Sequence, residues 1–182
     1  MKRALLLCAL AACGAPTAEP VNERKTFFAD GKPWSELHYA HGKPDGLWTT
    51  WHKNGQKASL GSYSEGAMSG HWQRWYEDGA HAVDANYRAG LLDGDYEEWW
   101  PNGKRHTHGS YRAGKAEGLW TEWDRDERKL LEGSFVNGER EGLWTGWNPA
   151  TGAVRRHALY SKGQAVDDPV KRQAALDAAG IK

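Results

Sequence analysis

Glycines and large aromatic residues recur along this chain in a pattern with a period of 24 residues. Each copy contains a glycine, a large ring two positions later and a tryptophan three positions after that ring. The five clearest copies begin at Gly46, Gly70, Gly94, Gly118 and Gly142. Nine of the 11 tryptophans fall in this register. A fixed period of this length indicates a repeat architecture, in which each unit buries apolar surface against its neighbours.

The second half of each copy alternates as a β-strand does. A small residue is followed two positions later by an aromatic one, as in Gly61 and Tyr63. Between the halves of three copies lie Asn54-Gly55, Asp78-Gly79 and Asn102-Gly103. Such pairs favour a type I′ turn, because both of its central residues need positive φ. Each copy therefore predicts a β-hairpin with a two-residue loop, in which Lys53 pairs with Gln56.

The ring after each opening glycine defines a first ring row, which consists of Trp48, Trp72, Tyr96, Trp120 and Trp144. Counting outward from the turn places Trp48 opposite Gly61 and Trp120 opposite Gly133. We expect each ring to pack over the small residue of its own hairpin partner, because a ring over glycine fills space densely in a sheet. The sequence therefore assigns the first ring row to the core.

The later tryptophan of each copy defines a second Trp row, which consists of Trp51, Trp75, Trp99, Trp123 and Trp147. In a regular strand, a residue three positions after a core ring lies on the opposite face, unless a β-bulge changes the parity. Polar residues such as Thr49, Gln73 and Glu97 share that expected face. We interpret the second Trp row as half-solvated and as the candidate binding face.

The N-terminus has the pattern of a secretory signal. Met1 to Arg3 is basic, and residues 4–12 are apolar but too few to span a bilayer. The segment Leu10-Ala11-Ala12-Cys13 resembles a bacterial lipobox, in which the cysteine thiol accepts the lipid. The resemblance implies a mature chain that begins at Cys13, carries acyl chains such as palmitate and is anchored in the bacterial outer membrane. An ordinary signal peptide with a chance cysteine is the alternative.

The predicted parts are a signal peptide at 1–12, a flexible tether at 13–24, repeats at 25–165 and a C-terminal segment at 166–182. In that last segment, Asp168-Pro169 has the pattern of an N-cap and first helical residue, and Gly180 that of a stop. We expect a short helix that caps the last hairpin through a face containing Val170, Ala174 and Ala178. A frayed tail is the alternative.

The combined pattern Gly-x-Trp-x-x-Trp-x-x-Asn-Gly, followed by Gly-Ser-Tyr-x-x-Gly, resembles the MORN repeat in its bacterial variant form. The resemblance covers about residues 27–160 and departs at 123–127, where the turn glycine is lost. It implies an all-β fold: an extended, curled antiparallel sheet of five to six stacked β-hairpins. For function, it implies protein–protein scaffolding, a membrane-associated role, or an antitoxin-like or immunity role.

Composition and motifs argue against catalysis and against nucleic-acid binding. The 24 basic residues balance 24 acidic ones, without the basic stripe that a nucleic-acid partner requires. No nucleophile, phosphate-loop or zinc-protease motif occurs. His106 and His108 lie two apart and would share a strand face, but no third ligand accompanies them, so solvated histidines are the simpler interpretation. We therefore expect no enzyme activity, cofactor or metal.

Two classes of binding function remain open. In the first, the chain is a lipid-anchored envelope protein whose repeat surface binds an unknown protein partner, which is a toxin if the chain is an immunity protein. In the second, the tryptophans bind a glycan or the cell wall, because such rings stack on sugar faces. The segment from Trp72 to Gly79 partly resembles choline-binding repeats, which have a shorter period.

Overall fold

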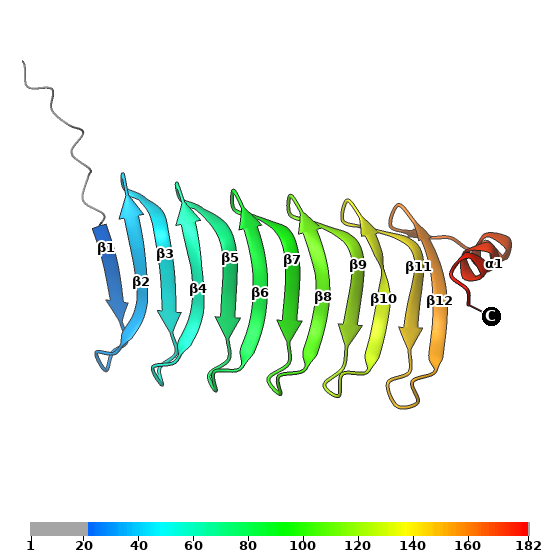
Figure 1. Ribbon diagram of the computed structural model, residues 1–182, viewed down its shortest axis with the longest axis horizontal. Helices are drawn as coiled ribbons and strands as arrows, with labels where there is room; N and C mark the ends of the chain where they lie inside the picture. The colour runs from blue at the N-terminus through cyan, green and yellow to red at the C-terminus, as the bar shows by residue number, and fades with distance from the viewer. Residues whose placement is uncertain (1–21, 182) are drawn as a thin grey trace, which may run out of the picture.

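The computed structural model describes residues 22–181, which form one open antiparallel sheet of 13 strands followed by a short helix (Figure 1). The strands lie side by side in sequence order, so the topology is a continuous meander. The predicted fold class is confirmed: an all-β repeat sheet of stacked hairpins with a short C-terminal helix. The first strand begins at Asn22, three residues before the predicted start of the repeats. Cys13 lies outside the described residues.

The strands are β1 (Asn22–Phe27), β2 (Pro33–Ala40), β3 (Lys43–Trp51), β4 (Lys57–Ser64), β5 (Ala67–Trp75), β6 (His81–Arg88), β7 (Leu91–Trp99), β8 (Arg105–Arg112), β9 (Lys115–Trp123), β10 (Lys129–Val136), β11 (Glu139–Trp147), β12 (Val154–Ser161) and β13 (Gln164–Ala165). The helix is α1 (Pro169–Ala178).

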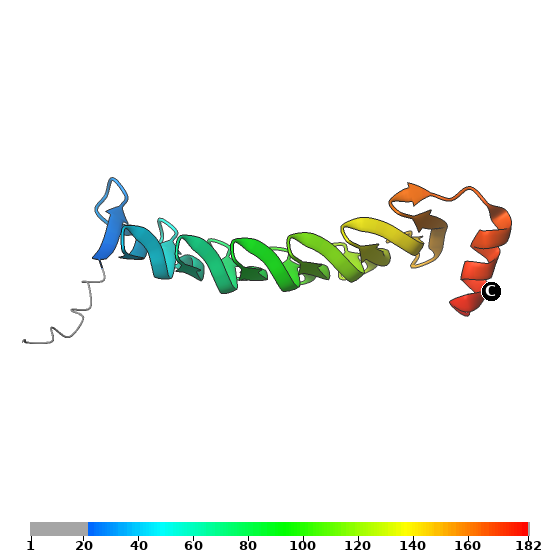
Figure 2. The same cartoon turned by 90° about the horizontal axis from the view of Figure 1, so that it is seen from above.

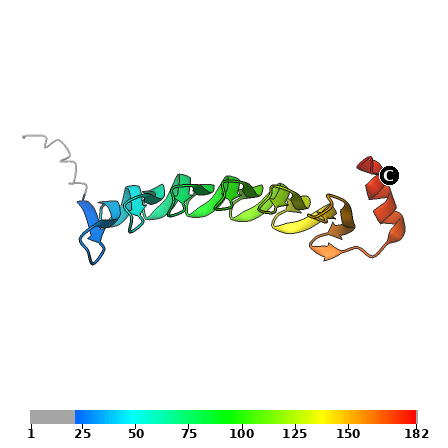
Figure 3. The same ribbon diagram turned by 90° about the horizontal axis from the view of Figure 1, so that it is seen from below.

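The sheet is a single layer, and within residues 22–181 nothing packs on either face of its central strands (Figures 2 and 3). Burial is therefore confined to a thin stripe of side chains. Trp72 and Trp144 are 5% and 4% exposed, and Ala85, which pairs with Trp72, is 3% exposed. The most buried rings thus belong to the first ring row, as its assignment to the core predicts.

Two kinds of turn connect the strands, one kind at each end of the strands. At one end, two-residue turns such as that of Ala89 and Gly90 have positive φ at both residues (50° and 82°), which is the type I′ geometry. At the other end, the β3–β4 connection has five residues. There the N–H of His52 donates to the carbonyl of Gln56 over 2.8 Å.

The predicted type I′ turn at Asn54-Gly55 is wrong. Gly55 has a φ of 91°, whereas Asn54 keeps a negative φ and accepts a hydrogen bond from the N–H of Gln56 through its side chain (3.0 Å). The predicted pairing of Lys53 with Gln56 is wrong for the same reason. The Asn-Gly pair here belongs to a longer connection in which only the glycine needs the left-handed region.

The predicted register beyond this turn is nevertheless confirmed, because two differences cancel. Trp48 pairs with Gly61, as counted from the sequence. The longer turn shifts the pairing by one residue, and a bulge beside Trp51, which leaves Ala58 of β4 without a partner, shifts it back. Because the extra residue lies on β4, strand β3 keeps its alternation. The second Trp row therefore lies on the face opposite the first ring row.

The ring that covers Gly61, Gly109 or Gly133 belongs to the following hairpin. A methyl group at Gly133 would lie 2.2 Å from the ring of Trp144, and one at Gly61 would lie 2.1 Å from the ring of Trp72. The expected packing of Trp120 over Gly133, and of Trp48 over Gly61, is therefore wrong, although these backbones pair as predicted. The tightest ring contacts join neighbouring repeats instead of the two strands of one hairpin.

A distortion between hairpins explains this contact. The pairing of β4 with β5 breaks between Leu60 and Ser62, which leaves Gly61 without a partner on that side. The ring of Trp72 extends across β4, and its Nε1–H donates to the carbonyl of Ser62 over 3.2 Å. The same bond, also 3.2 Å long, joins Trp120 to Ser110 and Trp144 to Ser134.

Helix α1 begins where the sequence predicts. The side chain of Asp168 accepts hydrogen bonds from the N–H groups of the first turn, with Pro169 as the first helical residue. The helix contacts β11 and β12, as a cap should. The predicted contact face is wrong, because Val170 is 77% exposed, whereas Ala175 and Leu176 are half-buried. Within the described part of the chain, no helix has the length and apolar character needed to span a bilayer.

Candidate binding site on the aromatic face

The face of the sheet that carries the first ring row is called the aromatic face below. On this face, a tyrosine or phenylalanine of one hairpin contacts the first-row ring of the next hairpin edge to face. The contacts in this series are Tyr63–Trp72 at 5.2 Å, Tyr111–Trp120 at 5.1 Å and Phe135–Trp144 at 4.9 Å between ring centroids. These separations lie in the favourable range for aromatic pairs. The rings therefore join each unit to its neighbour.

Within residues 22–181 this series lacks two members, Tyr39–Trp48 near one end of the sheet and Tyr87–Tyr96 in its middle. Among the described residues, no ring contact joins Tyr87 to Tyr96, which hold the equivalent positions on β6 and β7. Two differences from the units that have the ring contact coincide in the middle of the sheet: Ala85 replaces a glycine, and Tyr96 replaces a tryptophan. The methyl group of Ala85 occupies space that an indole takes elsewhere, and the single ring of Tyr96 is smaller than an indole.

A hollow of about 510 Å³ lies at the interruption between Tyr87 and Tyr96. Its lining consists of Trp48, Ser59, Met68, Trp72, Arg74, Val83, Ala85, Tyr87, Leu92, Tyr96 and Tyr111. Its volume is within the range of pockets that hold small ligands or single side chains. Most of the lining is aromatic or aliphatic, so the hollow favours an apolar occupant.

The lining of the hollow has these polar side chains besides its indoles: Ser59, Arg74, Tyr87, Tyr96 and Tyr111. The Tyr96 hydroxyl donates a hydrogen bond to Glu98. Burial, helped by this bond, raises the pKa of Tyr96 above its ordinary value, and burial also raises the pKa of Tyr63 and Tyr111. These hydroxyls therefore stay neutral at physiological pH. Arg74 is exposed and makes no hydrogen bond or ion pair with the residues of 22–181.

The second Trp row lies on the other face, and its rings are half-buried. His81 lies edge-on to both Trp75 and Trp99, with centroids 5.5 Å and 5.4 Å away. Cations cover the next two rings: Arg105 lies over Trp123 at 5.9 Å, and Lys129 over Trp147 at 5.5 Å. Much of this row is thus covered by the chain's own side chains, and its role as a binding face stays a prediction.

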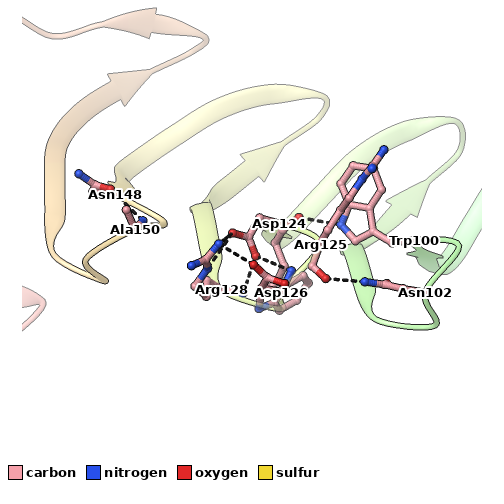
Figure 4. A network of polar contacts seen from close by, with 9 residues as sticks. Trp100, Asn102, Asp124, Arg125, Asp126, Arg128, Asn148 and Ala150 are labelled. Carbon is pink, nitrogen blue, oxygen red and sulfur yellow. Dashed lines mark hydrogen bonds and ion pairs between the residues drawn. The ribbon is translucent and has the colours of Figure 1, made fainter.

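The five-residue turns are linked from one unit to the next (Figure 4). The Nε1–H of Trp100 donates to the carbonyl of Trp123 over 3.1 Å, and the side-chain amide of Asn102 donates to the carbonyl of Arg125 over 2.6 Å. Similar bonds join the preceding turns. The backbone carbonyls at this end of the strands are therefore used in contacts that hold the repeats together.

The turn that has lost its glycine is held by Asp124. Its carboxylate accepts hydrogen bonds from the N–H groups of Arg128 and Asp126, each 2.9 Å long, and from the Arg128 guanidinium. These donors, the Arg128 N–H above all, hold the pKa of the Asp124 carboxyl below its usual range. Glu127 then adopts the positive φ (65°) that glycine adopts in other turns.

The two histidines considered as metal ligands lie on opposite faces. His106 is the bulged residue of β8, with Nδ1 3.3 Å from Glu98, whereas His108 pairs with Glu97, the residue before. The expectation that they share a face is wrong, because the bulge changes the parity.

Another group with metal-ligand chemistry gathers in the described residues: Glu23, Glu36 and His38. The ammonium of Lys25 lies 3.0 Å from Glu23 and 3.4 Å from Glu36, so a cation of the chain itself already compensates these carboxylates.

Comparison with known protein families bears on this repeated geometry. Three of the units match the MORN repeat variant. The matched residues are 20–41, 44–65 and 92–113. Tyr96 of β7 and Tyr111 of β8 lie in the third match. Three hairpins of the sheet are therefore similar to MORN repeat units.

Other comparisons are sparser. No curated protein matches the chain. One solved structure with similarity to this chain is a glycosylation-associated protein complex from Streptococcus agalactiae. The two chains are 12% identical with a TM-score of 0.33, and the alignment covers 59% of this chain and 20% of that chain.

Sequence reasoning missed the hollow and Arg74. The signal was present, because Ala85 and Tyr96 depart together from the pattern of the other units. Their effect depends on the contact between neighbouring hairpins. Counting residues outward from the turn of one hairpin predicts only the pairing inside that hairpin.

Proposed function

We propose that this chain is a lipid-anchored binding protein of the bacterial cell envelope, and that its aromatic face docks a partner protein. One observation carries the choice of face: an aromatic hollow lies on a surface that nothing in residues 22–181 covers. Protein interfaces are enriched in aromatic residues and arginine, and their energetic centres are pockets that take anchoring side chains. The match to MORN repeat units supports a binding role over a catalytic one. An antitoxin-like role is the case in which the partner is a toxin.

Cross-linking from single positions tests the choice of face. A photoreactive phenylalanine analogue is placed at Glu122 or at His108, which are exposed residues on neighbouring strands and on opposite faces. Docking on the aromatic face predicts a cross-linked species of defined mass from position 122 and none from position 108. Cross-links from position 108 alone would contradict the proposal. Circular dichroism of both variants controls for folding.

The anchor is tested separately. Lipidation at Cys13 predicts that Cys13→Ser releases the chain from membranes or leaves its precursor uncleaved. It also predicts that the wild-type chain, measured by intact mass, begins at Cys13 and carries added acyl mass. Cleavage at another residue without acyl mass would contradict the anchor and leave the docking face untouched.

The second Trp row supports a second candidate function, because its rings are half-exposed on a face that is otherwise polar. In that case Trp99→Ala loses partner capture or binding of peptidoglycan fragments while the far-ultraviolet spectrum is kept, since anchors at interface centres cost about 2 kcal/mol or more on truncation. A purely structural row predicts a lower melting temperature with binding unchanged.

A further inference from the structure

The interruption between Tyr87 and Tyr96 has contacting ring pairs of the series on both of its sides, Tyr63–Trp72 and Tyr111–Trp120. Three other pairs of neighbouring hairpins have the equivalent ring contact, with centroids 4.9–5.2 Å apart. Here both rings line the hollow without meeting across it. Each of them contacts a ring on its other side, Trp72 at 5.8 Å and Tyr111 at 5.4 Å. One more ring between them would complete the chain of aromatic contacts.

The walls of the hollow favour an aromatic ring over a sugar. Met68, Val83 and Leu92 supply aliphatic surface, and the hydroxyl of Tyr96 is already donated to Glu98. A sugar ring would bring several hydroxyl groups that need partners, and leaving them unpaired carries a desolvation cost. An aromatic side chain has no such requirement and gains edge-to-face contacts.

Arg74 gives the hollow a charge preference. It is exposed, it lines the hollow and it has no partner among the described residues. A guanidinium in this position pairs with a carboxylate more specifically than an ammonium does, because its fork of N–H donors matches the two oxygens. The next charged residue in its row, Glu98, is held by Tyr96 and His106.

We propose that the hollow between Tyr87 and Tyr96 receives an aromatic side chain of the partner protein, and that Arg74 pairs with a carboxylate next to that side chain. The recognised element is a peptide segment in which an aromatic residue adjoins an acidic group. This inference rests on the proposed docking of a partner on the aromatic face and names the chemistry that the face selects.

The probes are N-acetyltryptophan, which joins the ring to a carboxylate, and N-acetyltryptophanamide, which lacks the charge. Binding to the full-length chain is measured by saturation-transfer NMR observed on the probe, since the 11 tryptophans of the protein obscure fluorescence. Both probes are expected to receive magnetisation at millimolar concentration, with the carboxylate form bound a few-fold more tightly, in keeping with an exposed ion pair. Absence of transfer to either probe overturns the inference.

Two variants test the two parts of the site. Ala85→Gly combined with Tyr96→Trp introduces the glycine–tryptophan pair that the chain itself uses elsewhere, so an indole fills the hollow and transfer to both probes should disappear. Arg74→Gln should remove the preference for the carboxylate and leave the amide unchanged. Glu122→Gln, on the same face outside the hollow, is the matched control and should change neither result. Unchanged binding in the filled variant overturns the site, provided that circular dichroism shows a folded sheet.

A sugar probe and partner capture separate this inference from the proposed function. Chitobiose that displaces N-acetyltryptophan would mean that the hollow recognises a glycan, which overturns the peptide assignment. Cross-linking from position 122 that persists in the filled variant would show that a partner docks on the aromatic face without using the hollow. In that result the proposed function stands and this inference fails. Loss of both probe binding and cross-linking in the filled variant supports this inference.

Discussion

Neighbouring hairpins of this sheet pack against each other in two ways. At Gly61, Gly109 and Gly133, the indole of the following unit lies so close that a methyl group would approach it within 2.1–2.3 Å. At Ala85 a methyl group is present, and the following unit carries Tyr96 in place of tryptophan. Volume added on one strand is thus accompanied by volume removed on the next. The exchange also changes the pairing, because Ala85 pairs with Tyr96, whereas Gly61 has no partner on the following hairpin. It leaves the hollow, so one local departure from the repeat creates the candidate site.

The largest effect is expected where a side chain is added to a glycine that an indole covers. Gly133→Val places a β-branched side chain where the ring of Trp144 lies, and should destabilise the fold by about 1–3 kcal/mol through overpacking. Ser134→Val is the control, because that side chain points to the opposite face and should cost less. Thermal unfolding followed by circular dichroism measures both. Equal losses in melting temperature would show that the close ring contact at Gly133 is incorrect.

A double-mutant cycle sharpens the comparison by introducing the alanine–tyrosine combination at Gly133 and Trp144. Gly133→Ala and Trp144→Tyr should each destabilise the sheet, but together they recreate the combination of Ala85 with Tyr96. We expect a favourable coupling of about 0.5–3 kcal/mol, measured by urea unfolding. Gly133→Ala with Trp120→Tyr should couple less strongly, because Trp120 pairs with Gly133 across the hairpin but its ring does not cover that glycine. Coupling with Trp120 alone would restore the packing first predicted within the hairpin.

The reverse exchange should have a smaller effect on stability. Ala85→Gly alone is expected to cost about 0.5–1 kcal/mol, since glycine in a strand loses backbone entropy and here no indole covers it. Adding Tyr96→Trp should recover that loss. Urea midpoints of the single and double variants decide the matter, and a double variant less stable than Ala85→Gly would contradict the exchange.

The smallest expected effect concerns alkaline pH. The raised pKa of Tyr96 means that the folded state holds this proton more tightly than the unfolded chain does. Its contribution to stability is complete below the ordinary pKa of about 10 and is lost as the pH rises toward the folded value. The urea midpoint of unfolding should therefore decrease as the pH rises above about 10. It should decrease less steeply with pH in Tyr96→Phe. An identical slope in both proteins would contradict this account.

The register of each hairpin was predictable because it depends on residues that alternate along one strand and pair with the next. Trp48 opposite Gly61 follows from counting. The turn at Asn54-Gly55 was mispredicted because Asn-Gly occurs both in two-residue type I′ turns and in longer connections with a single left-handed glycine. The register survived only because a bulge compensated the longer turn.

The packing between hairpins was not predictable in the same way. The indole of Trp72 reaches Gly61 through a distortion in the β4–β5 pairing, and no pairwise count includes it. The candidate site depends on this contact. The sequence pattern alone therefore did not indicate that Ala85 and Tyr96 form part of a site. The contact face of α1 was missed for a related reason: alanines at helical spacing mark a possible face without saying which side meets the sheet.

The pairing of each strand with its sequence neighbours alone has a kinetic consequence. Domains whose contacts are local in sequence have low contact order and fold fast for their size, and single hairpins close within about 1–10 μs. The β2–β3 hairpin can form its pairing before β12 has been synthesised, and each later hairpin adds to an existing edge. We expect this chain to acquire its structure progressively as it is made, from its N-terminal units toward α1.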